Sequence, residues 1–270
     1  MKKDIKLIAI DLDGTLLGED REIVEENKEI VKKLHKEGYK IVLATGRAFN
    51  GYWWIRQDLG LEGFDDYTIC NTGAFVRRNA DGKLLFDNSL SKDDYEKIIS
   101  LRGDYDLQVG IYTKDILYNN SDVVNEGFLK DQRVMKMPRQ KFEDFDDIDQ
   151  KVARINFMGE EEVLDKFYEE NKEKLEADYM TMRNETYSLE VLSKDSGKEK
   201  SLEKLCDFLE ISLDQVMYLG DGANDKEAIR AVGVGVAMDN AGDDVKEAAD
   251  FLTKDNESAG VAHFLKEYLD

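Results

Sequence analysis

The decapeptide IAIDLDGTLL (residues 8–17) joins an apolar run to two carboxylates that are one residue apart. The run from Ile5 to Ile10 is short and nearly continuous, which is typical of a parallel strand covered on both faces. Asp11 and Asp13 therefore follow directly on a buried strand. Two carboxylates held this close raise each other's pKa unless a cation lies between them. Because both offer only oxygen ligands, the stretch predicts a divalent metal site, with Mg²⁺ as the favoured ion.

Three more stretches repeat this construction, an apolar strand followed by a turn of small and polar residues. They are YKIVLATGR (39–47), YTICNTGAF (67–75) and VMYLGDGAND (216–225). A helical pattern at 24–34, ended by Gly38, separates the first two strands, which predicts a right-handed strand-helix-strand unit with parallel strands. Because ligands bind outside the carboxyl ends of parallel strands, we expect the four turns to lie together.

The middle of the chain has a different pattern. Stretches of alternating polarity between about residues 84 and 192 are separated by two acidic, lysine-rich helical stretches near 91–101 and 160–175. Alternation predicts a sheet with one covered face. The expected fold is therefore α/β, a doubly wound, Rossmann-like parallel-sheet core (1–83 and 194–270) with an inserted α+β cap domain (84–193).

Composition excludes several classes of function. The 59 acidic and 38 basic residues give a net charge of -21, which argues against nucleic acid or an anionic membrane as partner. No apolar stretch reaches the roughly 20 residues of a membrane span. Two cysteines, Cys70 and Cys206, predict core thiols in a reducing cytoplasm. With only His35 and His263 available, we expect carboxylates to carry any catalysis.

The second and third candidate groups could bind an anion. Thr45-Gly46-Arg47 offers a hydroxyl and backbone N–H groups at a strand end, although an ordinary strand-to-helix turn has the same composition. Ser196 and Glu199 have capping-box spacing, which would place Lys198 in the first turn of a helix. A lysine is disfavoured at a helix N-terminus unless the site holds anions, and a surface lysine is the alternative.

The fourth group lies in LGDGAND (219–225), after a strand and before a helix. Asp221 is placed to complete a metal site with Asp11. Asn224 or Asp225 could equally cap the following helix, and capping does not exclude ligation.

Taken together and in this order, the motifs D-x-D-G-T, T-G-R, K and G-D-x-x-N-D resemble the four signature motifs of the haloacid dehalogenase-like hydrolase superfamily. The stretch from VGVAMDNAGDD onward is similar to the C-terminal part of its Cof-type branch. An insert between the second and third motifs resembles the type II, subclass B cap of that branch. The resemblance covers the expected core, 1–83 and 194–270.

The resemblance implies hydrolysis of a phosphomonoester through an aspartyl-phosphate, with Mg²⁺ as cofactor. The implied roles are a nucleophile and Mg²⁺ ligand at Asp11; an acid and base at Asp13, whose backbone carbonyl also binds the metal; phosphate binding by Thr45, Gly46, Lys198 and Asn224; a direct metal ligand at Asp221, oriented by Asp225; and a substrate contact at Arg47.

The expected substrate is a small phosphorylated metabolite, most readily a sugar phosphate, with nucleotide, flavin and pyridoxal phosphates as alternatives. A phosphomannomutase-like phosphoryl transferase and a non-catalytic binding protein of the same fold stay open, as does the oligomeric state. Three departures from the family pattern bear on substrate contacts. Glu199 follows Lys198 where glycine is common, Asn71-Thr72-Gly73-Ala74 replaces Tyr-Asn-Gly-Ala, and RNET (183–186) replaces a return segment rich in Ser and Pro.

Overall fold

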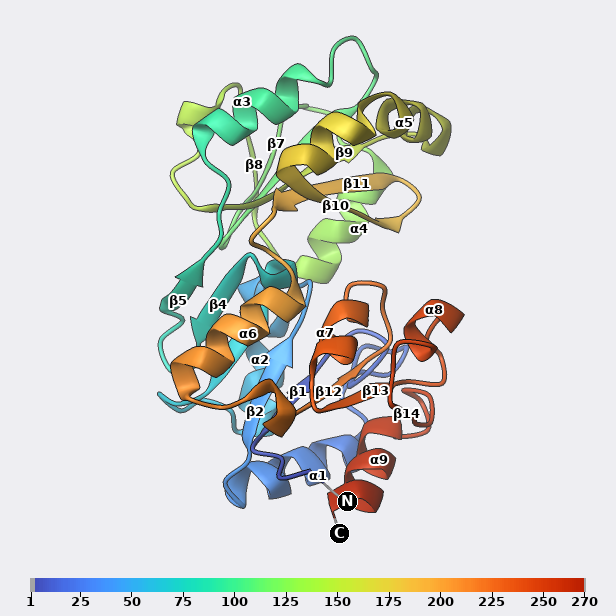
Figure 1. Ribbon diagram of the computed structural model, residues 1–270. Helices are drawn as coiled ribbons and strands as arrows, with labels where there is room; N and C mark the ends of the chain where they lie inside the picture. The colour runs from blue at the N-terminus through green and yellow to red at the C-terminus, as the bar shows by residue number, and fades with distance from the viewer. Residues whose placement is uncertain (1–2, 270) are drawn as a thin grey trace. The chain divides into compact units, whose positions relative to one another are not determined.

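The computed structural model describes residues 3–269, which form two compact units (Figure 1). The first contains the described residues up to 46, then 53–86 and those from 197 onward. The second contains residues 47–52 and 87–196. The insert thus begins and ends a few residues later than the sequence suggested. It also takes in residues 47–52, which we had assigned to the core.

The first unit is built on an eight-stranded sheet with the order β14-β13-β12-β1-β2-β3-β4-β5. Its strands are β1 (Leu7–Ile10), β2 (Lys40–Ala44), β3 (Tyr67–Cys70), β4 (Phe75–Arg78), β5 (Leu84–Asp87), β12 (Val216–Gly220), β13 (Val234–Ala237) and β14 (Phe251–Leu252). The strands from β14 to β3 run parallel, and β4 pairs antiparallel with β3. Sequence analysis had found the central strands but not β4, β5 or β14.

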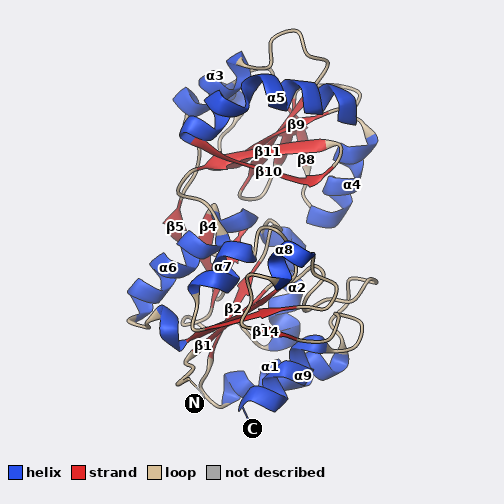
Figure 2. Ribbon diagram, turned by 45° about the vertical axis from the view of Figure 1, so that its right-hand side comes forward, coloured by secondary structure: helices blue, strands red, loops and turns tan. Residues whose placement is uncertain are grey.

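Helices cover both faces of this sheet, as a doubly wound fold requires (Figure 2). They are α1 (Glu25–Lys36), α2 (Phe49–Leu59), α6 (Lys198–Leu209), α7 (Lys226–Ala231), α8 (Asp243–Lys246) and α9 (Gly260–Leu269). Leu7 and Ala9 of β1 pack in one apolar cluster with Leu202 of α6 and Ile229 of α7. Ile8 and Ile10 alternate to the opposite face and are fully buried. The expected fold class is therefore confirmed.

Helices α1 and α9 lie side by side (Figures 1 and 2). Asn27 lies on the buried face of α1 and is completely inaccessible to solvent. Its Oδ1 accepts a hydrogen bond from the backbone N–H of Ala262 (2.8 Å), and its Nδ2 donates to the carbonyl of Leu16 (3.4 Å). One buried amide thus joins α1, α9 and the loop that follows Asp11.

Helix α2 carries both tryptophans of the chain, Trp53 and Trp54. The guanidinium of Arg56 lies 3.2 Å from the ring centroid of Trp53 and donates to the carbonyl of Asn79 (2.6 Å). Arg56 is buried because its charge is met by this aromatic face, by the carbonyl and by Glu62 at 3.6 Å.

The register of the parallel strands aligns their carboxyl ends. Ile10 pairs with Leu43 of β2 and with Leu219 of β12, so Asp11 leaves β1 at the level where those strands end. Strand β3 lies beyond β2, and the N–H of Thr72 donates to the carbonyl of Thr45 (3.1 Å). The four turns predicted to meet thus follow four adjacent strands, β12, β1, β2 and β3.

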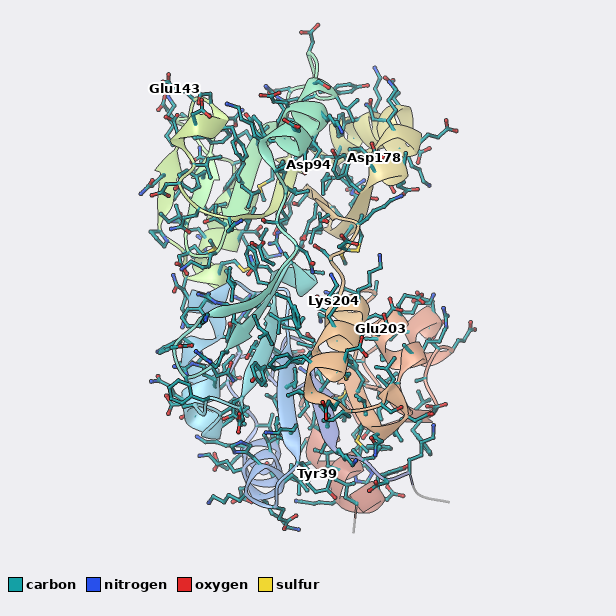
Figure 3. All side chains as sticks on the ribbon, turned by 60° about the vertical axis from the view of Figure 1, so that its left-hand side comes forward. Tyr39, Asp94, Glu143, Asp178, Glu203 and Lys204 are labelled. Atoms are coloured by element: carbon teal, nitrogen blue, oxygen red, sulfur yellow. The ribbon has the colours of Figure 1, made fainter. Side chains whose placement is uncertain are left out.

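The second unit is built on a six-stranded sheet with the order β10-β11-β9-β6-β7-β8. Its elements are β6 (Gln108–Thr113), β7 (Leu117–Asn119), β8 (Arg139–Lys141), β9 (Val152–Met158), β10 (Tyr179–Glu185), β11 (Ser188–Ser193), α3 (Lys92–Ser100), α4 (Glu126–Met135) and α5 (Glu161–Asp178). Helix α3 begins at a capping box between Ser91 and Asp94, which is labelled in Figure 3. The two acidic helical stretches of the sequence are α3 and α5.

Both faces of this second sheet carry apolar clusters. Ile111 and Phe157 pack with Phe167 of α5 in one cluster, whereas Tyr112 packs with Phe128 of α4 in another. The prediction of a single covered face was therefore incomplete. Sequence analysis did not predict helix α4, whose ten residues are EGFLKDQRVM.

No helix within residues 3–269 is both long and apolar enough to cross a bilayer. The thiols of Cys70 and Cys206 are buried, as expected.

Candidate active site

A buried ion cluster lies at the carboxyl edge of the first sheet. Asp11 follows β1 and is 5% exposed, while Lys198 is the first residue of α6 and is 1% exposed. The ammonium of Lys198 lies 2.6 Å from Asp11 Oδ1 and 2.7 Å from Asp225 Oδ1. Burial by itself lowers the pKa of Lys198, but the charges of Asp11 and Asp225 outweigh this effect and raise it. Lys198 is therefore cationic, and it is no surface lysine.

Asp225 is held by hydrogen bonds to both of its carboxylate oxygens. Besides Lys198, Oδ1 accepts from the hydroxyl of Tyr218 (2.6 Å). Its Oδ2 accepts from the backbone N–H groups of Gly222 (2.9 Å) and Asp221 (3.3 Å). Four bonds use the acceptor capacity of a carboxylate, so Asp225 is suited to orient the loop rather than to bind a cation directly. Asp225 is also the residue before α7, but its side chain makes no capping bond there.

Asp221 lies against the loop that follows Asp11. Its Oδ1 accepts from the hydroxyl of Thr15 (2.7 Å), and its Oδ2 lies 3.4 Å from Asn240 Nδ2, which also donates to the carbonyl of Gly14 (2.9 Å). Burial raises the pKa of Asp221 to about 6, the bond from Thr15 opposes this, and the charge of Asp225 adds to it. Two loops that are distant in sequence are thus joined at one carboxylate.

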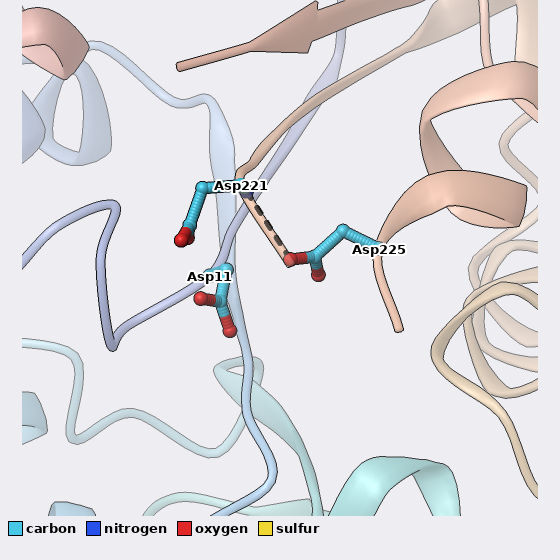
Figure 4. A group of neighbouring side chains, drawn as sticks. All are labelled: Asp11, Asp221 and Asp225. Carbon is cyan, nitrogen blue, oxygen red and sulfur yellow. Dashed lines mark hydrogen bonds between the residues drawn. The ribbon is translucent and has the colours of Figure 1, made fainter. Parts of the chain in front are cut away.

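The carboxylates of Asp11, Asp221 and Asp225 form a donor set that fits a divalent cation. Oxygens of all three lie within 4.8 Å of one another (Figure 4). Burial raises the pKa of Asp11 well above its usual range, and the charges of Asp225 and Asp221 add to this more than Lys198 can offset. Carboxylate oxygens are ligands that suit Mg²⁺ and other hard divalent cations. Since Asp225 is saturated, Asp11 and Asp221 are the two carboxylates suited to direct ligation.

Gly14 gives a test of this geometry. Its φ is +82°, and a Cβ there would lie 2.2 Å from Asp221 Oδ2. We expect Gly14→Ala to displace the Asp221 carboxylate and to cost about 1–3 kcal/mol of stability. If the carboxylate of Asp221 binds Mg²⁺, the variant should also lose the Mg²⁺-dependent rise in melting temperature expected of the natural protein. The matched control is Gly38→Ala, where φ is +100° and no described residue other than the chain neighbours has an atom within 4 Å of the added methyl. If both variants retain the Mg²⁺-dependent rise, the carboxylate of Asp221 is not a ligand.

The start of α6 differs from the prediction. Lys198 does occupy its first turn, but the residue before it, Gly197, is the N-cap, with φ at +120° and no side-chain cap. The hydroxyl of Ser196 is buried and has no hydrogen-bond partner within the described residues. The capping box was wrong because Gly197 donates its N–H to the carbonyl of Thr72 (3.0 Å), and this bond sets how the chain enters the helix.

The remaining predicted residues lie in the same turns or beside them. Thr45 is fully buried after β2, Asn224 is half-buried in the turn after β12, and Asp13 is exposed two residues after Asp11. Arg47 is buried in the second unit, where it donates to the carbonyl of Gly51 (2.9 Å). The roles assigned to these residues stay predictions.

Sequence analysis did not identify Thr15, Tyr218 or Asn240 as parts of the site. Thr15 belongs to the D-x-D-G-T motif, so its spacing was a usable signal. Tyr218 is an aromatic residue within an apolar strand, and only the structure reveals its bond to Asp225. Asn240 follows β13, the next strand along this edge of the sheet, where a polar residue could have been suspected.

A parallel sheet that presents crowded carboxylates and a buried lysine at its carboxyl edge fits an enzyme that acts on phosphate groups. Comparison with known proteins makes this assignment specific. A model of the haloacid dehalogenase-like hydrolase family matches residues 8–265, and the chain belongs to this family.

Individual relatives support the same family assignment. The phosphatase YwpJ of Bacillus subtilis (strain 168) is 28% identical, covering 98% of this chain and 100% of that protein. The 5-amino-6-(5-phospho-D-ribitylamino)uracil phosphatase YwtE of the same organism is 29% identical, covering 98% of each. The crystal structure of a haloacid dehalogenase-like hydrolase from Bacteroides thetaiotaomicron superimposes with a TM-score of 0.88 at 28% identity, covering 97% of this chain and 99% of that one. The expected enzyme class, a phosphatase, is confirmed.

Proposed function

We propose that the chain is a Mg²⁺-dependent phosphomonoesterase that hydrolyses a small phosphorylated metabolite through an aspartyl-phosphate. The observation that carries this proposal is the position of the Asp11 carboxylate, which lies 2.6 Å from the ammonium of Lys198 and within 4.8 Å of a carboxylate oxygen of Asp221. A carboxylate can attack phosphorus only where the negative charge of the phosphate is offset. Mg²⁺ held by Asp11, Asp221 and the backbone carbonyl of Asp13 would add positive charge to that of Lys198.

The proposed reaction has two displacements. In the first, a carboxylate oxygen of Asp11 forms a bond to phosphorus as the P–O bond to the alcohol breaks, and Asp13 gives its proton to the departing alkoxide. In the second, Asp13 takes a proton from water, whose oxygen attacks phosphorus and releases inorganic phosphate and free Asp11. Lys198, Thr45, the backbone N–H of Gly46 and Asn224 hold the phosphoryl oxygens through both steps. Asp13 is suited to proton exchange because it is exposed.

The substrate is proposed as a sugar phosphate or a related phosphorylated polyol. Three of the curated relatives are named as 5-amino-6-(5-phospho-D-ribitylamino)uracil phosphatases, which makes this phosphorylated ribityl compound a specific candidate. A panel of sugar, nucleotide, flavin and pyridoxal phosphates together with this compound tests the proposal through the release of inorganic phosphate. A phosphoryl transferase would instead yield isomerised sugar phosphate, so both products are measured.

Metal binding is expected to depend on pH. The pKa of Asp221 is raised to about 6 and that of Asp11 is raised as well, so protonation stabilises the metal-free protein. The contribution of Asp221 is complete below its unfolded pKa near 4 and is lost as the pH rises through 6. Because Mg²⁺ binds the ionised carboxylates, it should raise the melting temperature more at pH 8 than at pH 5.

Thermal unfolding in EDTA and in Mg²⁺ at the two pH values measures this effect. Asp244→Asn, at an exposed carboxylate on α8, is the control that should leave the Mg²⁺ effect intact. An equal Mg²⁺ effect at pH 5 and pH 8 would argue against ligation by Asp11 and Asp221.

A further inference from the structure

The turn after β3 has an unusual backbone. Asn71, Thr72 and Gly73 have φ values of 51°, 54° and 80°, so three consecutive residues lie in the left-handed region. Glycine adopts this region freely and asparagine tolerates it, but threonine is disfavoured there because its Cβ is branched. Asn71 and Thr72 are each only 2% exposed, so this turn is part of the interior.

Backbone hydrogen bonds explain why the turn must be left-handed. The N–H of Thr72 donates to the carbonyl of Thr45 (3.1 Å), and its carbonyl accepts from the N–H of Gly197 (3.0 Å). The hydroxyl of Ser201 donates to the carbonyl of Gly73 (2.7 Å), and a Cβ on Gly73 would lie 2.2 Å from the carbonyl oxygen of Gly197. The turn therefore connects the loop of Thr45 to the start of α6, where Lys198 lies.

These backbone bonds do not explain why residue 72 is threonine. Glycine or asparagine would make the same main-chain bonds with less strain. Within residues 3–269, Thr72 Oγ1 takes part in no hydrogen bond. The neighbouring Asn71 Oδ1 is buried and also has no hydrogen-bond partner within that range. Backbone strain together with two polar groups that lack hydrogen-bond partners is typical of a functional position.

The hydroxyl of Thr72 lies beside Gly46. It is the atom nearest to the position that a Cβ on Gly46 would take, at 3.4 Å, and Gly46 is partly exposed. Gly46 belongs to the loop proposed above to bind phosphate. The hydroxyl therefore borders the place where phosphoryl oxygens are expected.

We propose that Thr72 is a substrate-binding residue whose Oγ1 donates a hydrogen bond to an oxygen of the phosphate group. This inference rests on the proposed phosphatase function and adds a residue that the four sequence motifs do not contain. A role for the hydroxyl would explain the strained threonine, because neither glycine nor asparagine puts a hydroxyl at this position.

The test compares Thr72→Val and Thr72→Gly, which lack the hydroxyl, with Thr72→Ser, which keeps it. Thr72→Val removes the proposed hydrogen bond to the charged phosphate with little change of side-chain shape. This loss should raise KM for an aryl phosphate and Ki for inorganic phosphate by about tenfold, with a smaller effect on kcat. Thr72→Ser should restore both constants to within about threefold. Because the hydroxyl has no hydrogen-bond partner among the described residues, Thr72→Val should leave the melting temperature unchanged. Thr72→Gly tests the same loss with the backbone strain relieved.

Thr68→Val is the matched control. Thr68 is fully buried on β3, but its hydroxyl is paired with Asn79 Oδ1 (2.8 Å). Its replacement should lower the melting temperature and leave KM and Ki unchanged, the opposite pattern to Thr72→Val. If Thr72→Val and Thr72→Gly keep the KM and Ki of the natural protein, or if Thr72→Val only loses stability, the inference is wrong.

A second measurement separates this inference from the proposed function. The rise in melting temperature caused by inorganic phosphate with Mg²⁺ reports binding without turnover. If the natural protein hydrolyses no phosphoester, the proposed function fails. The inference is then supported only if phosphate still stabilises the natural protein and not Thr72→Val. It is overturned if phosphate stabilises both equally or neither.

Discussion

Asp11→Asn is expected to lower the release of phosphate from an aryl phosphate by at least about 10⁴-fold, because an amide cannot act as the attacking nucleophile. Folding should survive, since the burial of Asp11 raises its pKa and disfavours the carboxylate that the substitution removes. Lys198 also keeps its partner Asp225 in this variant. The loss should therefore appear in kcat with little change in melting temperature, measured on the same preparation.

Asp4→Asn is the matched control for this variant. Asp4 is an exposed carboxylate just before the opposite end of β1, so its loss should leave kcat and the melting temperature unchanged. Substantial turnover by Asp11→Asn would show that the phosphoryl group is not transferred to this carboxylate. A coincident collapse of folding would assign Asp11 a structural role instead.

Lys198→Met is expected to have the largest effect on stability. The methionine fills most of the volume of the lysine but leaves Asp11 and Asp225 without their shared cation. Removing one partner of a buried ion pair costs about 3–5 kcal/mol, which denaturant unfolding in EDTA would measure. Turnover should fall by at least about 10³-fold, because the charge that offsets the phosphate is lost. Mg²⁺ should restore part of the stability by meeting the charge of Asp11.

The control for this variant is Lys200→Met, which removes an exposed lysine two residues further along α6. It should change neither the free energy of unfolding nor turnover by a comparable amount. If Lys198→Met matched Lys200→Met in both measurements, Lys198 would be neither the counterion of the cluster nor a phosphate ligand.

The parts of the fold that depend on local pattern could be predicted from the sequence. An apolar run that ends just before Asp11 indicates both a buried strand and its carboxyl end, and the same pattern located β2, β3 and β12. Helix α1 was found from its apolar face, and Gly38 follows its end with the positive φ that a C-terminal glycine provides.

Features that depend on distant contacts could not be predicted. The spacing of Ser196 and Glu199 is that of a capping box, but the bond between Gly197 and Thr72 determines the conformation there. Asn27 of α1 accepts a hydrogen bond from the backbone N–H of Ala262 in α9, and no local sequence pattern indicates a contact over such a separation. The left-handed conformation of Thr72 contradicts the preference of threonine, so sequence alone gave no reason to expect it.

The position of the two tryptophans determines what optical measurements of this protein can report. Trp53 and Trp54 are neighbours in α2 and both belong to the first unit, so intrinsic indole emission comes from one segment. The guanidinium over the Trp53 ring makes that emission sensitive to the local packing of α2. A melting curve followed by tryptophan fluorescence therefore reports the unfolding of the first unit, which contains Asp11. Far-ultraviolet circular dichroism is needed to detect the unfolding of α3 and α5.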